Sequence, residues 1–325
     1  MNKSYILTAL CSLLLAGCGG GGGGDGGSGG SSANYSALYG GTDYTSIATT
    51  TATASTSFNY ATPSLQFVAF GPTCTSSTSQ SITRTANVDV YGDGTITDPA
   101  VFAKVAKMTE ASVGRLKTIF QITSSVGLDN TNRVKVCASG SNTGNGSAGF
   151  ATLQIGVPSS DWQLAQLIQH ELVHMVQAQS LRCNTHQYRF ERWLAEGLAL
   201  RIGMQDETYK SEVASLKTSF EGAGFATPFH ELPTWDFPTF ARYPGYRLAV
   251  DTFLGVSGKS EKDVNEFLKS YGASVGCPAW NNPNDPYSGI GTGWKTQFDA
   301  YFGADLRGTG VLGTTFWTTA PTYAK

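Results

Sequence analysis

The run DWQLAQLIQHELVHMVQAQS at residues 161–180 constrains the fold of this chain more than any other stretch. Ser160 precedes it and Gln163 follows three positions later, which is the spacing of a capping box at the N-terminus of a helix. We therefore expect an α-helix that begins after Ser160 and continues to about Gln179. Both histidines of this segment then lie on one face of that helix.

These two histidines, His170 and His174, flank Glu171 in the pattern HExxH. Residues four apart on a helix lie one above the other, so both imidazoles can reach one ion while the glutamate projects beside them. The pattern is typical of a zinc site with two histidine ligands and a general base for the zinc-bound water. The alternative is a pair of core histidines that hydrogen-bond to polar neighbours. The chain has 4 histidines in 325 residues, so the pattern is unusual for its composition.

A catalytic zinc site needs a third protein ligand and keeps one position open for water. A second helix, predicted over about 188–204, carries the segment WLAEGLA at residues 193–199, in which Glu196 is the only acidic residue. Tryptophan and leucine surround this carboxylate, and a carboxylate in covered surroundings favours a cationic partner. We therefore expect Glu196 to face the two histidines.

The HELVH and WLAEGLA segments together resemble the gluzincin metallopeptidases, whose third zinc ligand is a glutamate on the next helix, often within W-L-x-E-G. The resemblance implies that the two helices pack antiparallel. It also implies one catalytic Zn²⁺ ion held by His170, His174 and Glu196, with Glu171 as the general base. The resemblance covers approximately residues 84–305.

A tyrosine that donates a hydrogen bond to the tetrahedral oxyanion precedes a helix in gluzincins, and the segment YPGYRLAVDTFLGVSG at residues 243–258 resembles that helix. Matching Gly258 to the glycine that closes the family's helix implies this role for Tyr243. Tyr246 is an alternative, and His230 is a third candidate. Both tyrosines are also consistent with aromatic residues at the boundary between core and water.

The G-x-M-E-N stretch by which gluzincin aminopeptidases bind a substrate amino group has no counterpart here, because the strand before the HELVH helix is FATLQIGV at residues 150–157. Exopeptidase action is therefore unsupported, and we expect an endopeptidase. The same strand is expected to serve as an edge to which an extended peptide can pair through its backbone.

The order of the remaining segments predicts an α+β fold, zincin-like, with a small N-terminal mixed β-sheet and a mostly helical C-terminal subdomain. The predicted strands are 64–70, 83–94, 133–139 and 150–157, and the further helices are 98–120, 207–221, 245–256, 261–271 and 293–302. A Gly-rich loop is expected between the last two strands. We place the first subdomain at 63–206 and the second at 207–325.

The N-terminal residues 1–17 read as a signal peptide, with a short apolar stretch after Lys3 that is too brief to span a membrane. The sequence LAGC that ends at Cys18 resembles a bacterial lipobox, which implies lipidation of Cys18. We expect residues 18–62, rich in Gly, Ser and Thr, to form a poorly ordered tether. The predicted location is the bacterial cell envelope, anchored by lipid and at the outer membrane, since Gly19 follows the cysteine.

Four further cysteines, Cys74, Cys137, Cys183 and Cys277, are an even number in an exported chain and suggest two disulfides. Three pairings are open. We favour Cys74 with Cys137 and Cys183 with Cys277, because each pair then ties segments within one half of the chain.

Charged residues make up only 14% of the chain and the net charge is −2, so no basic surface is expected for nucleic acid. We hypothesise a membrane-anchored zinc metallopeptidase that acts on a peptide or protein substrate. The alternatives are a surface binding protein or adhesin that keeps the scaffold without catalysis, and a zinc hydrolase of a non-peptide bond. The intact Glu171 disfavours the binding protein, which has no use for a general base beside an open metal site.

Overall fold

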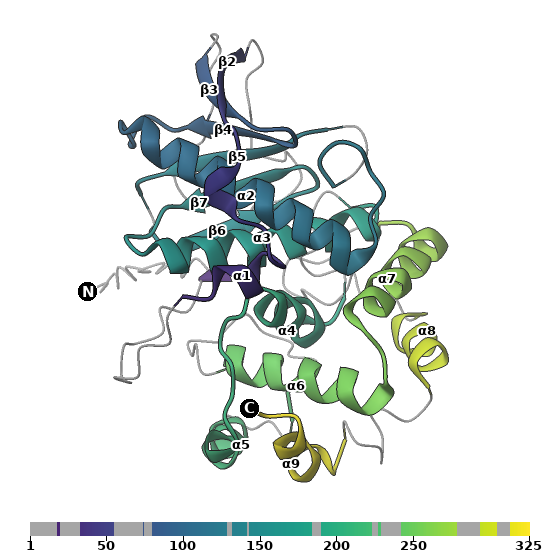
Figure 1. Cartoon of the computed structure of the whole chain (residues 1–325). Helices are drawn as coiled ribbons and strands as arrows, with labels where there is room; N and C mark the ends of the chain where they lie inside the picture. The colour runs from purple at the N-terminus through teal and green to yellow at the C-terminus, as the bar shows by residue number, and fades with distance from the viewer. Residues whose placement is uncertain are drawn as a thin grey trace, which may run out of the picture.

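The computed structural model describes residues 18–19, 33–54, 74, 80–128, 132–141, 143–183, 190–222, 227–228, 242–277, 293–303 and 313–325. In this part of the chain a mixed β-sheet packs against two long helices, and further helices lie beyond them (Figure 1). The predicted α+β class is therefore confirmed.

The sheet has the strand order β1-β6-β7-β5-β4-β3-β2. β4, β5 and β7 run parallel to one another, and the other neighbouring pairs are antiparallel. The parallel strands are almost continuously buried, as expected for the centre of a sheet. The strands are β1 (Cys18–Gly19), β2 (Thr50–Ala54), β3 (Gln80–Arg84), β4 (Val88–Gly92), β5 (Val134–Ser139), β6 (Asn145–Ala148) and β7 (Thr152–Gly156).

Two predicted strands, 133–139 and 150–157, are confirmed as β5 and β7. The strand predicted over 83–94 is wrong in extent, because β3 and β4 form an antiparallel pair with a turn between Arg84 and Val88. The Gly-rich segment expected to be a loop contains β6, which pairs with β7 on its outer side. β7 is therefore an inner strand, and the expectation that it forms the edge is wrong. The strand predicted at 64–70 lies outside the described residues.

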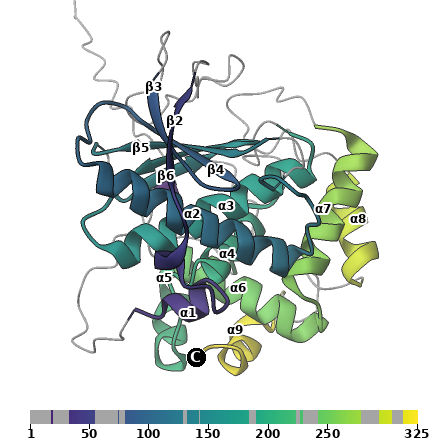
Figure 2. The ribbon, with the colours of Figure 1, turned by 45° about the horizontal axis from the view of Figure 1, so that its top comes forward.

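Each predicted helix has a counterpart among the seven longer helices of the described residues, α2 to α8. Their bounds are α2 (Pro99–Phe120), α3 (Asp161–Ser180), α4 (Arg192–Ile202), α5 (Val213–Gly222), α6 (Arg242–Ser257), α7 (Glu261–Val275) and α8 (Gly293–Phe302). The shorter ones are α1 (Tyr35–Leu38), α9 (Phe316–Thr319) and three 3₁₀ turns at Tyr44–Ser46, Lys210–Glu212 and Ala320–Thr322. Figure 2 shows α7 and α8 side by side at one end of the molecule.

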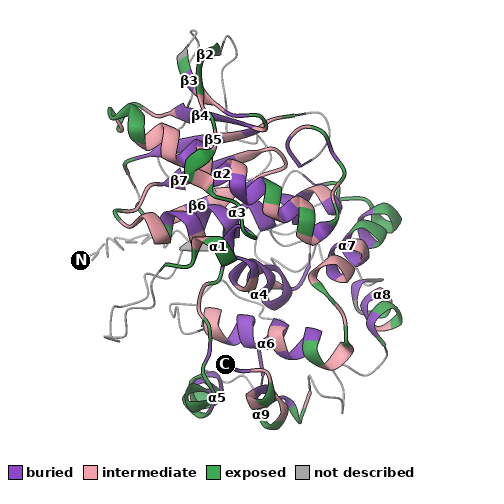
Figure 3. Cartoon of the chain, viewed as in Figure 1, coloured by how far each residue is buried: buried purple, intermediate pink, exposed green. Residues whose placement is uncertain are grey.

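The helix α3 carries the HELVH segment and begins as predicted, since the Ser160 side chain accepts a hydrogen bond from the backbone N–H of Gln163. It packs against α2, β6 and β7 on one side and against α4 on the other. α6 packs on α4, so α3 and α4 lie between the sheet on one side and α6 on the other. Figure 3 shows α4 almost entirely buried.

The segment 33–54, expected to belong to a poorly ordered tether, is structured in part. It contributes α1 and the strand β2 to the fold, and Leu38 and Tyr39 are buried in the main hydrophobic core. Tyr35 packs edge-on against Trp162 in the first turn of α3, with ring centroids 5.3 Å apart. The globular part therefore begins before the predicted Pro63, because these aromatic residues bury apolar area against α3.

Both favoured disulfides are confirmed. Cys74 is bonded to Cys137 in β5, with Cα atoms 5.6 Å apart, and Cys183 just after α3 is bonded to Cys277 after α7, with Cα atoms 5.0 Å apart. Among the helices that the structure describes, none combines the length and the apolar character needed to cross a lipid bilayer.

Candidate metal centre

Three buried side chains, His170, His174 and Glu196, meet between α3 and α4. The two imidazole Nε2 atoms are 3.0 Å apart, and each lies 3.4 Å from Oε2 of Glu196. The sequence therefore predicted correctly which three side chains come together.

These separations fit a metal ion. At metal–ligand distances of about 2.0–2.1 Å, two ligands at a tetrahedral angle lie roughly 3.3 Å apart. The three observed separations lie close to this value, and two nitrogens with one oxygen form a donor set that suits a divalent transition metal. A buried group of this kind could hold one metal ion.

The outer nitrogens of both imidazoles support this fit. His174 Nδ1 lies 2.8 Å from Oε1 of Gln177, while Nε2 of Gln177 donates to the carbonyl of Ala195 at 2.9 Å. The amide oxygen of Gln177 thus has to face the imidazole, which places the proton on Nδ1. His170 Nδ1 makes the equivalent contact to Oε1 of Gln205, also at 2.8 Å. Both Nε2 atoms are then left with lone pairs that face the shared point.

The charge state of Glu196 follows from its neighbours. Burial alone would raise its pKa, but the charge of His174 when that imidazole is protonated, hydrogen bonds with His170 and His174, and the positive charge of Arg192 hold the pKa of Glu196 well below its usual value. The carboxylate is therefore available as an anionic ligand across the ordinary pH range.

Glu171, the expected general base, is completely buried beside the group. Neither of its carboxylate oxygens has a hydrogen-bond partner among the described residues. Burial raises the pKa of Glu171 to about 8; the charge of His170 opposes this shift and that of Glu196 adds to it. A buried carboxyl group next to a potential cation is a group that can exchange a proton near neutral pH.

The strand β6 holds Glu171 in place. A Cβ atom added to Gly146 would lie 2.6 Å from Cγ and 2.8 Å from Oε1 of Glu171, so only glycine allows the strand to approach this side chain. In the antiparallel pairing with β1, Gly146 also stands opposite Cys18. The strand β6, second from one edge of the sheet, thus lies directly against the expected general base.

The glycine of WLAEGLA has a similar role between helices. A Cβ atom on Gly197 would lie 2.7 Å from Cγ2 of Val250 and closer still to the carbonyl oxygen of Tyr246, both in α6. Glycine at this position therefore lets α6 approach α4 at the residue next to Glu196.

Tyr243, in the first turn of α6, contacts Arg192, which lies one helical turn before Glu196 on α4. Its hydroxyl accepts a hydrogen bond from Nη2 of Arg192 at 3.4 Å, and Arg192 is close enough to Glu196 to lower its pKa. Tyr246 is buried, and its ring lies 6.2 Å from that of Tyr243. The third candidate, His230, lies outside the described residues.

Four residues of the site were missed by the sequence analysis: Gln177, Gln205, Arg192 and Gly146. Gln177 follows His174 by three positions on one helix, and this spacing is a signal that could have revealed it. Arg192 likewise precedes Glu196 by four positions on α4, whereas Gln205 and Gly146 reach the site from segments whose packing has no local signature in the sequence. Comparisons of the sequence with protein-family models and with curated proteins find no match.

Proposed function

We propose that this protein is a zinc-dependent peptidase, gluzincin-like in its site, that hydrolyses internal peptide bonds. The observation that carries the proposal is the buried group of His170, His174 and Glu196 with a buried Glu171 beside it that has no hydrogen-bond partner among the described residues. A structural metal site has no need for a second carboxyl group buried beside its ligands, whereas a hydrolytic site uses one as its general base.

A zinc ion bound there would polarise the scissile carbonyl and lower the pKa of its water to about 7. Glu171 takes the proton of the attacking water and later delivers it to the leaving amine. Its burial suits this role, because a carboxyl group with a raised pKa holds and releases a proton near neutral pH. Gly146 keeps that carboxyl group in position from the side of the sheet.

Tyr243 is the proposed donor to the oxyanion that forms as water attacks. Its hydroxyl, engaged by Arg192, can donate its own proton because the arginine supplies the N–H of that contact. Arg192 adds a positive charge close enough to Glu196 to lower the pKa of that carboxyl group. Loss of one such donor typically costs about 10²- to 10³-fold in rate.

We further propose that the chain works in the bacterial envelope, held to the outer membrane by lipid on Cys18. The motif at residues 15–18 and the two disulfides, which need an oxidising compartment, support this location. The substrate is a peptide or protein outside the cytoplasm.

Metal analysis and peptide digestion test the proposal together. The purified protein is expected to contain about one zinc ion per chain by the ligand count and to cleave a mixed peptide library, read by mass spectrometry, only without chelator. Glu171→Gln should retain zinc and lose cleavage. Zinc retention without any chelator-sensitive cleavage would instead favour a binding protein, and a Glu171→Gln variant as active as wild type would refute the mechanism.

A further inference from the structure

The segment from Gly203 to Thr208, which follows α4, has an unusual backbone. Met204 has φ 55° and Asp206 has φ 48°, so two residues with side chains occupy the left-handed region on either side of Gln205. Met204 closes α4 in a Schellman-type cap, since the backbone N–H of Gln205 donates to the carbonyl of Leu200 at 2.9 Å. Asp206 belongs to the residue types that tolerate the left-handed region. The residue between the two is the one whose side chain reaches His170.

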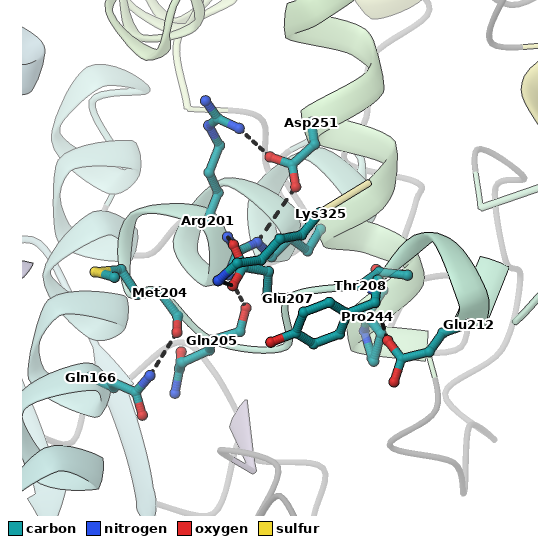
Figure 4. A network of polar contacts seen from close by, with 12 residues as sticks. Gln166, Arg201, Met204, Gln205, Glu207, Thr208, Glu212, Pro244, Asp251 and Lys325 are labelled. Carbon is teal, nitrogen blue, oxygen red and sulfur yellow. Dashed lines mark hydrogen bonds and ion pairs between the residues drawn. The ribbon is translucent and has the colours of Figure 1, made fainter. Parts of the chain in front are cut away.

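Two side chains from other helices hold this conformation. Nε2 of Gln166 in α3 donates to the carbonyl of Met204 at 2.6 Å, and Nη1 of Arg247 in α6 donates to the carbonyl of Gln205 at 2.5 Å. The carbonyl group of Met204 and that of Gln205 are therefore both held by hydrogen bonds. Figure 4 shows the contact of Gln166 with the carbonyl of Met204.

The anchor Arg247 is itself buried and held by charge. Its guanidinium lies 3.4 Å from Glu207 and 3.5 Å from Asp251, and Asp251 also pairs with Arg201 of α4. At the outer end of the network, Nζ of Lys325 contacts Glu207 at 2.7 Å (Figure 4). The segment is thus tied to α3, α4 and α6, the helices that build the metal centre.

We propose that Gln205 is a positioning residue of the metal centre, and that the constrained segment around it exists to hold its amide oxygen against Nδ1 of His170. His174 needs no such device, because its partner Gln177 comes from the same helix. His170 has no glutamine in the corresponding place on α3, since Val173 stands three positions after it. Its tautomer and ring orientation are therefore set from outside the helix.

The inference rests on the metal site of the proposed function but not on peptide cleavage, and zinc affinity is its readout. Zinc dissociation constants are measured by competition with a chromophoric chelator, and melting temperatures are measured on the chelator-treated proteins. Gln205→Leu should weaken zinc binding about 10- to 100-fold. Gln205→Glu, which keeps an acceptor at this place, should restore an affinity close to that of wild type.

Two further variants test the anchoring. Gln166→Leu releases the Met204 carbonyl and should weaken zinc binding less than Gln205→Leu does. Lys325→Met removes the exposed ion pair with Glu207 and the contact of the ammonium with the Tyr209 ring, and serves as the matched control, with unchanged zinc affinity. If Gln205→Leu does not fold, Gln205→Asn, one carbon shorter, provides the same loss of contact with the amide retained.

The outcomes separate this inference from the proposed function. The positioning role is overturned if Gln205→Leu, or Gln205→Asn in its place, binds zinc within twofold of wild type while His170→Ala loses the metal. That result leaves the metal site intact. Equal zinc binding by wild type and His170→Ala would overturn the metal site and the inference with it. Weakened binding with an unchanged melting temperature and rescue by Gln205→Glu supports the inference.

Discussion

Replacement of Gly197 by alanine tests the packing that builds the candidate metal centre. Gly197 follows the candidate ligand Glu196, and its missing side chain allows α6 to pack directly on α4. A methyl group there meets Cγ2 of Val250 at 2.7 Å and the Tyr246 backbone at a still shorter distance. Favourable carbon–carbon contacts begin at about 3.5 Å, so the two helices have to separate by roughly 1 Å.

The magnitude follows from two opposing effects. Alanine in place of glycine inside a helix stabilises by about 1 kcal/mol. Overpacking costs about 1–3 kcal/mol, and we take about 3 because the obstacle includes backbone, which cannot rotate away. The free energy of unfolding of the variant should therefore be about 2 kcal/mol lower than that of wild type.

Gly114 provides the matched control, because it lies within α2, is exposed, and has no atom within 4 Å of an added Cβ. Gly114→Ala should gain about 1 kcal/mol, so the two variants should differ by about 3 kcal/mol. Urea denaturation of both variants, with equal m-values, measures this difference. A shift of about 1 Å in Tyr243 should also slow peptide cleavage by about 100-fold in Gly197→Ala alone. Equal changes in unfolding free energy for the two variants would refute the packing argument.

Further predictions concern the same centre. The pKa of Glu171 is about 8 in the folded protein and 4.5 in the unfolded chain, so ionisation of this group favours unfolding. In chelator-treated protein the free energy of unfolding should therefore fall, relative to that of Glu171→Gln, by up to about 5 kcal/mol as pH rises from 4.5 to 8. Denaturation of both proteins at both pH values checks this, and a difference that does not change with pH contradicts it. Gly146→Ala should displace Glu171 and reduce cleavage while zinc content, measured by atomic absorption, stays at the wild-type level. Arg192→Met should lower kcat more than it lowers zinc affinity, and an unchanged kcat would remove Arg192 from the proposed oxyanion site. His174→Ala should abolish zinc binding and the thermal stabilisation that added zinc gives to wild type.

Local patterns in the sequence determined the core of the candidate site. A capping serine and a run of helix-forming residues fix α3, and the 3.6-residue period then places His170 and His174 on one face without further information. Glu196 could be predicted for a related reason, because a single carboxylate in the otherwise apolar segment WLAEGLA has to face a cation. The disulfide pairing was also predictable, since each pair joins segments within one half of the chain.

Only the tertiary structure decided what surrounds these ligands. The contacts of Gln205 with His170 and of Gly146 with Glu171 join segments that are separated by 35 and 25 positions along the chain. The strand β6 lies in a stretch so rich in glycine that its local propensity predicts a loop, and pairing with β7 overrides that propensity. Sequence spacing specifies which residues are neighbours along one helix. The packing of separate elements determines which side chains contact the candidate metal ligands, orient them and exclude water from them.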